Sequence, residues 1–236
     1  MPNSYFRFKQ FLINQNKTAM KVGTDGVLLG AWVDVSNAGS ILDIGTGTGL
    51  IAIMLAQRSD ANIDAVEIEE SAASQARENI ANCKWAKRIS IFHQSVQKFA
   101  VLSAQKYDLI VSNPPYFTNS LKSSDLTRDC ARHTEQLPYH ELLSSIDRLL
   151  SENGRFAGIF PYVEGNTFIA MASAHGLYCT KKTNVYGKTN GRLKRLLLEF
   201  RRTKIPLEED SLEIRTAEGN YAEKYIELTK DFYLDF

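Results

Sequence analysis

The 236-residue sequence predicts an α/β fold whose centre is a doubly wound, mostly parallel sheet. From Ser40 onward, short apolar runs alternate with amphipathic segments, as expected for parallel strands covered by helices on both faces. A glycine-rich turn at residues 45–49 follows the first apolar run and leads directly into a helical pattern. Two β-type runs near the C-terminus, separated by a turn at 187–191, predict an antiparallel hairpin. Together these observations predict a seven-stranded sheet.

The elements follow in order from this periodicity. Expected strands are residues 40–44, 62–68, 89–93, 107–112, 155–160, 177–186 and 193–202, and the acidic tail adds a short strand near 212–215. Expected helices are residues 50–58, 70–82, 139–150, 163–175 and 220–230. Asn153 and Gly154 are expected to end the helix 139–150. The polar loop 119–137 is too long for a plain connector, which predicts that it is functional or mobile.

The composition predicts one globular domain, residues 1–236, with 44% apolar and 23% charged residues. No apolar run is long enough to span a bilayer, so no membrane role is expected. Residues 1–21 lack the apolar region and cleavage site of a secretion signal, which favours a cytoplasmic protein. The three cysteines lie far apart without metal-ligand spacing, so neither a disulfide framework nor a bound metal is expected.

Charge is distributed unevenly along the chain despite a net charge of +1. Residues 181–204 carry nine basic side chains against one acidic, whereas residues 206–236 carry nine acidic against three basic. The N-terminal extension, residues 1–20, is also basic and rich in aromatic side chains. Such clusters are typical of a protein that meets a polyanion on one face. The alternative is a solvated strand surface whose lysines discourage pairing at the sheet edge.

The glycine-rich turn has the spacing Gly-x-Gly-x-Gly at Gly45, Gly47 and Gly49. Glycine lets the backbone turn tightly and approach a ligand closely, although a tight turn alone can also explain it. Asp43, two residues before the first glycine, would repel a pyrophosphate but could organise an ammonium group. Glu67, at the end of the second strand, could accept both ribose hydroxyls of a nucleoside. These features favour S-adenosylmethionine as the cofactor.

A second motif, Asn113-Pro114-Pro115-Tyr116, follows the fourth strand. Two consecutive prolines stiffen the chain and remove two backbone donors, so this corner presents carbonyls. The Asn113 side-chain oxygen and the Pro114 carbonyl could take both hydrogens of a planar NH2 group and aim its nitrogen at the sulfonium methyl. Tyr116 offers a ring face for an unstacked base. The motif predicts methylation of an exocyclic or amide nitrogen; the alternative is a proline-rich strand terminator.

Over about residues 20–200 this pattern resembles the Rossmann-like class I methyltransferases. The resemblance implies that Glu67 and Ile68 after the second strand, and Ser95 and Val96 after the third, complete the cofactor site. At this last position the family usually has an acidic residue that contacts the adenine amine. Gln94-Ser95-Val96 departs from that pattern, and the Ser95 hydroxyl is expected to make the contact instead.

Asn-Pro-Pro-Tyr also occurs in enzymes that modify guanine N2 or protein glutamine, so it does not choose the substrate. Residues 6–11, 20–32, 132–133 and 231–234 are similar to the bacterial tRNA1(Val) adenine-37 N6-methyltransferases, and the resemblance covers the whole chain. It implies that adenine 37, beside the anticodon of a valine tRNA, accepts the methyl group. It also implies that Lys21, Thr24 and Asp25 border the amino-acid end of the cofactor. Solvation of Lys21 and a helix N-cap at Asp25 are the alternatives.

The basic residues are then expected to contact RNA phosphates, which position RNA without reading its sequence. The expected contacts are Arg7, Lys9, Arg128, Arg132, His133, Lys188, Arg192 and Arg195. His133 is also consistent with a neutral structural histidine. The competing functions are a protein-glutamine methyltransferase, a guanine-N2 rRNA methyltransferase, and an RNA-binding protein that keeps a vestigial cofactor fold.

Overall fold

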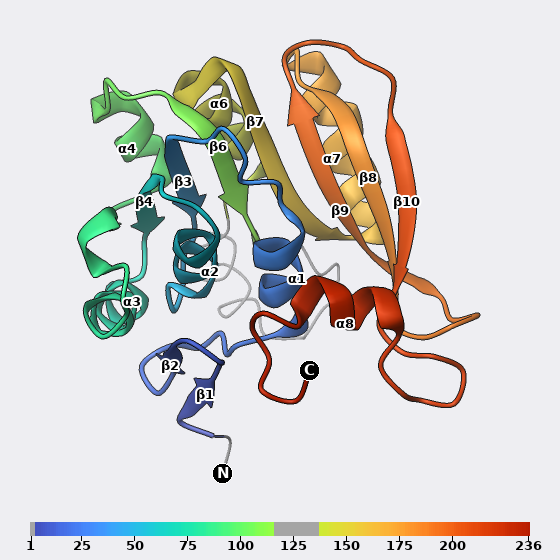
Figure 1. The fold of residues 1–236 in the computed structure, drawn as a ribbon. Coiled ribbons are helices and arrows are strands. Elements are labelled where there is room, and N and C mark those ends of the chain that lie inside the picture. The colour runs from blue at the N-terminus through green and yellow to red at the C-terminus, as the bar shows by residue number, and fades with distance from the viewer. Residues whose placement is uncertain (1–2, 116–136) are drawn as a thin grey trace, which may run out of the picture.

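The computed structural model describes residues 3–115 and 137–236, which form a central sheet with helices on both faces (Figure 1). Its eight strands are ordered β10-β8-β9-β7-β6-β3-β4-β5, and β9 runs antiparallel to its two neighbours, β7 and β8. The strands are β3 (Ser40–Ile44), β4 (Asn62–Glu67), β5 (Ile89–His93), β6 (Tyr107–Ser112), β7 (Leu150–Pro161), β8 (Tyr178–Tyr186), β9 (Leu193–Arg201) and β10 (Glu208–Glu213). The mostly parallel sheet with an antiparallel C-terminal pair is therefore confirmed, and the acidic tail contributes the eighth strand.

Alternating residues of the strands face two separate apolar cores. Ile41 belongs to the core that packs against α1 (Thr24–Trp32), α2 (Leu50–Arg58) and α8 (Glu223–Thr229). Leu42, the next residue, belongs to the core against α4 (Val96–Leu102), α6 (Tyr139–Leu149) and α7 (Tyr162–Ala174). Helix α3 (Glu70–Ala81) also contributes Ile80 to the first core. Because successive side chains of a strand point to opposite faces, near-continuous apolar runs are required in these strands.

Four expected elements, β3, α2, β5 and β6, have the predicted bounds, and others differ in informative ways. The prediction that Asn153 and Gly154 end the helix 139–150 is wrong, because α6 ends at Leu149 and both residues lie within β7. A Cβ at Gly154 would lie 2.8 Å from the Tyr107 carbonyl oxygen, so glycine permits close strand packing here. Helix α4 was not expected, and the loop 119–137 lies outside the described residues except for Leu137.

The N-terminal segment forms a small antiparallel pair, β1 (Tyr5–Arg7) and β2 (Leu12–Asn14), separate from the main sheet. Aromatic and polar residues alternate over 6–11 as in a strand, but β1 ends at Arg7, because Phe8 N–H donates to the Phe11 carbonyl and turns the chain. The Phe8 ring stacks on Phe11 and on Tyr233 near the C-terminus. The two ends of the chain thus pack together, as Figure 1 shows below α1 and α8.

Parallel strands β3, β4 and β6 end at one edge of the sheet, which we call the carboxyl edge. In the register, Ile44 lies beside Ser112 on one side and Val66 on the other. The residues that follow these strands therefore emerge next to one another, with about 4.8 Å between neighbouring strands. Ligands of open α/β sheets bind at such an edge. Among the described residues, no helix is both long and apolar enough to cross a membrane.

Candidate active site

The glycine-rich turn leaves the end of β3 and crosses to β4. Gly45, Gly47 and Gly49 have φ values of +72°, +57° and +83°, in the left-handed region that glycine adopts without steric cost. The Gly45 and Thr46 N–H groups donate to the Val66 carbonyl at 2.9 and 3.2 Å, which fixes the turn to β4. A Cβ at Gly45 or Gly47 would meet no atom of the described residues within 4 Å. The turn therefore exposes its backbone to a ligand.

Asp43 lies beneath this turn and is fully buried. Its Oδ2 atom accepts a hydrogen bond from the Thr46 hydroxyl at 2.6 Å, and its Oδ1 atom has no hydrogen-bond partner among the described residues. Burial raises the pKa of the Asp43 carboxyl to about 7, and the Thr46 hydrogen bond opposes this rise. A buried acceptor without a partner beside a ligand-binding turn fits the ammonium group expected there.

Glu67 ends β4 and is buried at the carboxyl edge. Its Oε2 atom accepts the Gly47 N–H at 2.9 Å, and its Oε1 atom accepts the Glu69 N–H at 2.9 Å. Each oxygen keeps a further lone pair for the expected ribose hydroxyl. Ile68, which comes next, is 61% exposed, although apolar residues of this size are mostly buried. It therefore offers an apolar surface beside Glu67.

Ser95 and Val96 lie next to Glu67, because the Gln94 N–H donates to the Glu67 carbonyl at 3.0 Å. Ser95 is the N-cap of α4, and its hydroxyl accepts the Lys98 N–H at 3.3 Å. The hydroxyl oxygen keeps a second lone pair, which can accept from the expected adenine amine. The Val96 side chain is buried in the core, so only its backbone can face the cofactor. The roles of both residues stay predictions.

The Asn-Pro-Pro motif begins directly after β6. The buried Ser112 hydroxyl donates to the Ile44 carbonyl at 2.9 Å and joins the ends of β6 and β3. Asn113 is half-buried, Pro114 is buried and Pro115 is exposed, while Tyr116 lies outside the described residues. Because Gly45 follows Ile44 and Asn113 follows Ser112, the two motifs leave neighbouring strands at paired positions. The structure thus brings the expected donor site and the expected acceptor site together.

Helix α1 borders the same edge. A Cβ at Gly26 would lie 3.2 Å from the Leu50 side chain, so the first turn of α1 packs where α2 begins. The N-cap of α1 is Gly23, which shows that the alternative of an Asp25 N-cap is wrong. The Asp25 carboxylate instead accepts the Arg195 Nε–H at 2.8 Å. One residue expected at the cofactor and one expected at RNA therefore form an ion pair.

Three buried polar residues, Gln15, Gln75 and Asn79, hold the N-terminal segment beside the glycine turn, and the sequence analysis missed them. The Asn79 side-chain amide accepts the Asn14 N–H and donates to the Asn14 carbonyl, both at 2.9 Å. It also donates to the Thr48 carbonyl within the glycine turn at 2.8 Å. Gln75 and Asn79 lie four residues apart on one face of α3, and this polar pair on a buried face was the available signal.

The N-terminal basic residues have several different surroundings. The Lys9 ammonium donates to the Lys230 carbonyl at 2.6 Å and to the Phe236 carbonyl, and so holds the C-terminal segment. Lys21 donates to the Gln15 carbonyl, whereas Arg7 and Thr24 are exposed. Of the remaining expected RNA contacts, Lys188 and Arg192 are exposed at the β8–β9 turn, and Arg128, Arg132 and His133 lie outside the described residues.

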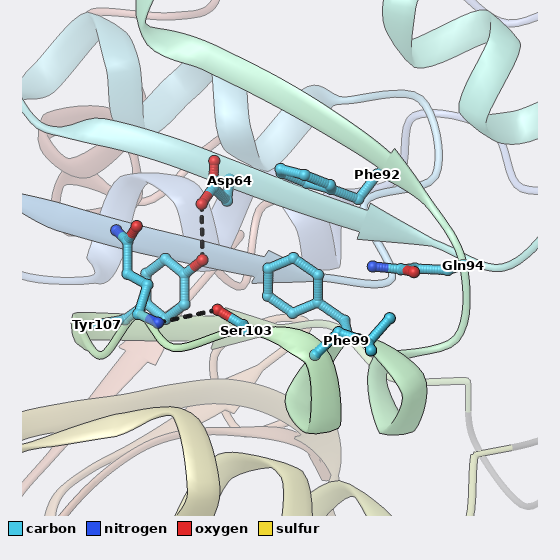
Figure 2. Close-up of a pocket in the computed structure, with 8 residues that line it drawn as sticks. Asp64, Phe92, Gln94, Phe99, Ser103 and Tyr107 are labelled. Carbon is cyan, nitrogen blue, oxygen red and sulfur yellow. Dashed lines mark hydrogen bonds between the residues drawn. The ribbon is translucent and has the colours of Figure 1, made fainter.

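A hollow of about 250 Å³ lies elsewhere, between α4 and the face of β4, β5 and β6 (Figure 2). Its wall includes the Tyr107 hydroxyl, which donates to Asp64 at 2.6 Å; burial, and next the Asp64 hydrogen bond, raise the pKa of Tyr107 well above its ordinary value. Only Gln94 of its lining comes from the chain that follows β5 at the carboxyl edge. The hollow includes neither the glycine turn nor Asn113, so it is not the expected donor site. Among the described residues, no group of His, Cys, Asp and Glu could hold a metal ion.

Comparison with known proteins agrees with this arrangement. Residues 18–153 match the family model of the methyltransferase small domain. A solved structure of a predicted O-methyltransferase from Agrobacterium tumefaciens has a TM-score of 0.68 and 17% identity, covering 88% of this chain and 96% of that one. At that identity the likeness shows the fold alone. The fold, the family model and the two adjoining motifs define an S-adenosylmethionine-dependent methyltransferase.

Curated relatives identify the family more narrowly. A tRNA1(Val) (adenine(37)-N6)-methyltransferase of Trichodesmium erythraeum is 47% identical and aligns over 100% of both chains. The protein of the same name from Haemophilus influenzae strain Rd is 48% identical over 99% of this chain and 100% of its own. The chain belongs to the tRNA1(Val) (adenine(37)-N6)-methyltransferase family.

Proposed function

We propose that this chain transfers the methyl group of S-adenosylmethionine to N6 of adenine 37 in tRNA1(Val). The observation that carries the proposal is the pairing of Ile44 with Ser112, closed by the Ser112 hydroxyl at 2.9 Å. This pairing sets Asn113 beside the glycine turn, so a planar amine held by Asn113 faces a methyl donor held by the turn. The acceptor nucleoside and the RNA are inferred from the names of the full-length relatives.

The chemistry follows from the acceptor. The adenine N6 lone pair is delocalised into the ring and is a poor nucleophile until that overlap weakens. The Asn113 side-chain oxygen and the Pro114 carbonyl accept its two hydrogens and orient the nitrogen, while Tyr116 supports the base. S-Adenosylmethionine would supply an electrophilic methyl group and leave as S-adenosylhomocysteine. No strong general base is needed before the transfer, because the N6 lone pair is already present and the nitrogen loses its proton once it has become cationic.

The donor is bound by groups at the carboxyl edge. In this proposal Asp43 faces the ammonium group, Glu67 the ribose, and Ile68 and the chain around Ser95 the adenine. The amino-acid end is bordered by Lys21, Thr24 and Asp25. The open space beside Gly45 and Gly47 and the buried Oδ1 atom of Asp43 support this placement.

The RNA approaches the same edge. We infer that the anticodon loop enters where Asn113 and the glycine turn meet. We also infer that the protein acts in the cytoplasm, where its tRNA substrate occurs. The exposed positions of Arg7, Lys188 and Arg192 support phosphate contacts on this side, and the N-terminal extension packs beside the same edge through Asn79. Arg128, Arg132 and His133 are proposed to meet the RNA around the acceptor base.

The test is methyl transfer from labelled S-adenosylmethionine to total RNA and protein from cells lacking the modification, followed by nucleoside mass spectrometry of the tRNA. We expect N6-methyladenosine at position 37, and Asn113→Ala should lower kcat by about 100-fold or more while donor affinity changes little. Label appearing only in protein or in rRNA guanine would contradict the proposal. So would tight tRNA binding by the wild type with no turnover.

A further inference from the structure

The basic stretch 181–204 is largely neutralised by acidic neighbours. Strand β10 lies parallel to β8, with Glu208 opposite Lys181 and Glu209 opposite Lys182. The Lys182 ammonium lies 2.8 Å from the Glu209 carboxylate, and the Lys181–Glu208 separation is 3.8 Å. Further along, Arg201 pairs with Glu199, Arg202 with Asp147, and Arg195 with Asp25. The face of β8 and β9 is therefore much less positive than the sequence suggests.

The turn between β8 and β9 keeps its charge. Lys188, Arg192 and Lys194 are exposed and form no ion pair with any residue that the structure describes. Residues 187–194 include no acidic residue. Cations without acidic partners attract an external anion most strongly, because no neighbouring carboxylate offsets their field.

The segment after β10 adds a fourth cation to this turn. The Thr189 N–H donates to the Arg215 carbonyl at 2.9 Å, which joins the two segments. The Arg215 guanidinium lies 4.1 Å from the centre of the Tyr221 ring and donates to the Gly219 carbonyl at 2.6 Å. A guanidinium held in this way loses less conformational entropy when it binds a phosphate. We call Lys188, Arg192, Lys194 and Arg215 the cationic tip; the nearby acids Glu213 and Glu218 leave it a net positive charge.

The cationic tip lies at the carboxyl edge. Arg195, at the start of β9, pairs with Pro161, the last residue of β7, so the turn before it extends past the end of β7. Strand β7 is parallel to β6 and ends at the same edge as Ser112. Figure 1 shows the β8–β9 turn and the segment after β10 projecting together beside α8.

We propose that the cationic tip binds the phosphate backbone of the RNA outside the target loop, and that β10 confines the RNA to the tip by neutralising the lysines of β8. The inference rests on the proposed function for its RNA and adds Lys194, Arg215 and the acidic strand to the binding surface. The paired charges make RNA binding along the face of β8 unfavourable. The RNA backbone is thereby directed to the edge at which Asn113 lies.

The experiment compares two double variants by fluorescence anisotropy with an unmodified tRNA transcript over a range of salt concentrations. Lys188→Ala with Arg215→Ala should weaken binding about tenfold at 0.1 M salt and reduce the salt slope by about two. The matched control, Lys182→Ala with Glu209→Ala, removes one existing ion pair and no net charge, and should change affinity less than about twofold. Glu209→Gln, which frees Lys182, should tighten binding to unrelated RNA.

The RNA affinities of the two double variants test the inference, and thermal melting checks that each variant remains folded. Equal losses in both doubles, or unchanged affinity in the first, would overturn the cationic tip. Unchanged binding to unrelated RNA in Glu209→Gln would overturn the role of β10. Methyl transfer by the wild-type chain to the same transcript is measured in parallel. Its absence overturns the proposed function, whereas persisting transfer with unaffected tip variants overturns this inference alone.

Discussion

The carboxyl edge and the β8–β10 unit achieve their properties by different means. At the carboxyl edge the main chain determines the geometry of the site: strand register sets Asn113 beside the glycine turn, and positive φ values shape the turn itself. In strands β8 to β10 the side chains determine the surface charge, because ion pairs between neighbouring strands leave only some cations available. Backbone geometry is specified by short local motifs, whereas charge pairing depends on which strands become neighbours.

This difference teaches that the two regions should respond separately to substitution. Changes at the carboxyl edge should alter donor binding and the chemical step, and changes at the cationic tip should alter RNA affinity and its salt dependence. The Asp25–Arg195 ion pair is a direct polar contact between α1, at the carboxyl edge, and β9, which follows the cationic tip. Substitutions that move both properties together, away from this pair, would contradict the separation.

The largest effect is expected from two glycines of the turn. An alanine at Gly47 or at Gly49 takes on a left-handed backbone, which costs about 1–2 kcal/mol at either position. A Cβ at Gly47 enters the open space proposed for the donor, whereas a Cβ at Gly49 makes ordinary contacts of 3.5 Å with Ala76 and Ile80. We expect Gly47→Ala to raise the Kd for S-adenosylmethionine about tenfold or more, and Gly49→Ala to change it much less.

Thermal melting and calorimetric donor titration check this pair of variants. Similar losses of stability with different donor affinities are expected. If both variants bind the donor equally well, the space beside Gly47 is not the donor site. RNA affinity in the absence of donor should not change in either variant.

The elements around the donor site were predictable because their signals are local. β3, α2 and β6 are apolar runs bounded by glycine or proline, and the site motifs stand directly at their ends. The parallel arrangement then follows from the alternation of strands and helices, and it places both motifs at one edge. For this reason Asp43, Glu67 and Asn113 could be brought together from the sequence alone.

Features that depend on distant partners could not be predicted. Residues 208–210 are acidic and gave no strand signal, yet they form β10 because Lys181 and Lys182 lie opposite. Arg195 was interpreted with the other basic residues, and only the fold shows that Asp25 neutralises it. Likewise, the spacing of Gln75 and Asn79 on α3 could indicate a buried polar pair, but it does not identify the partners of Asn79, which are the N-terminal segment and the glycine turn.

A smaller effect is expected where the N-terminal segment meets the carboxyl edge. Asn79→Ala removes three hydrogen bonds, two of them to part-buried backbone groups of Asn14 and one to the buried carbonyl of Thr48. We expect the free energy of unfolding to fall by about 1–3 kcal/mol, with faster proteolysis of residues 3–22. Asn82→Ala, at the C-cap of the same helix, removes one exposed hydrogen bond to the Glu78 carbonyl and should cost less than about 0.5 kcal/mol. Urea unfolding and limited proteolysis distinguish the variants, and equal costs would exclude Asn79 as the anchor of the segment.

The last comparison tests whether a side-chain charge also acts at the carboxyl edge. Because burial raises the pKa of Asp43 to about 7 from an ordinary value of 3.8, the folded chain holds a proton that the unfolded chain releases. The stability of the wild type relative to Asp43→Asn should therefore fall as the pH rises from about 4 to about 7, and should level off above that.

Binding of the donor should lower the raised pKa of Asp43. An ammonium group near the Asp43 Oδ1 atom stabilises the carboxylate and lowers the pKa of Asp43, so donor binding at pH 6 should release a proton. Calorimetry in two buffers with different ionisation enthalpies measures that release, and Asp43→Asn should abolish it. Equal proton release in the wild type and the variant would show that Asp43 does not sense the donor. The carboxyl edge would then act through its backbone alone, and its contrast with the β8–β10 unit would be complete.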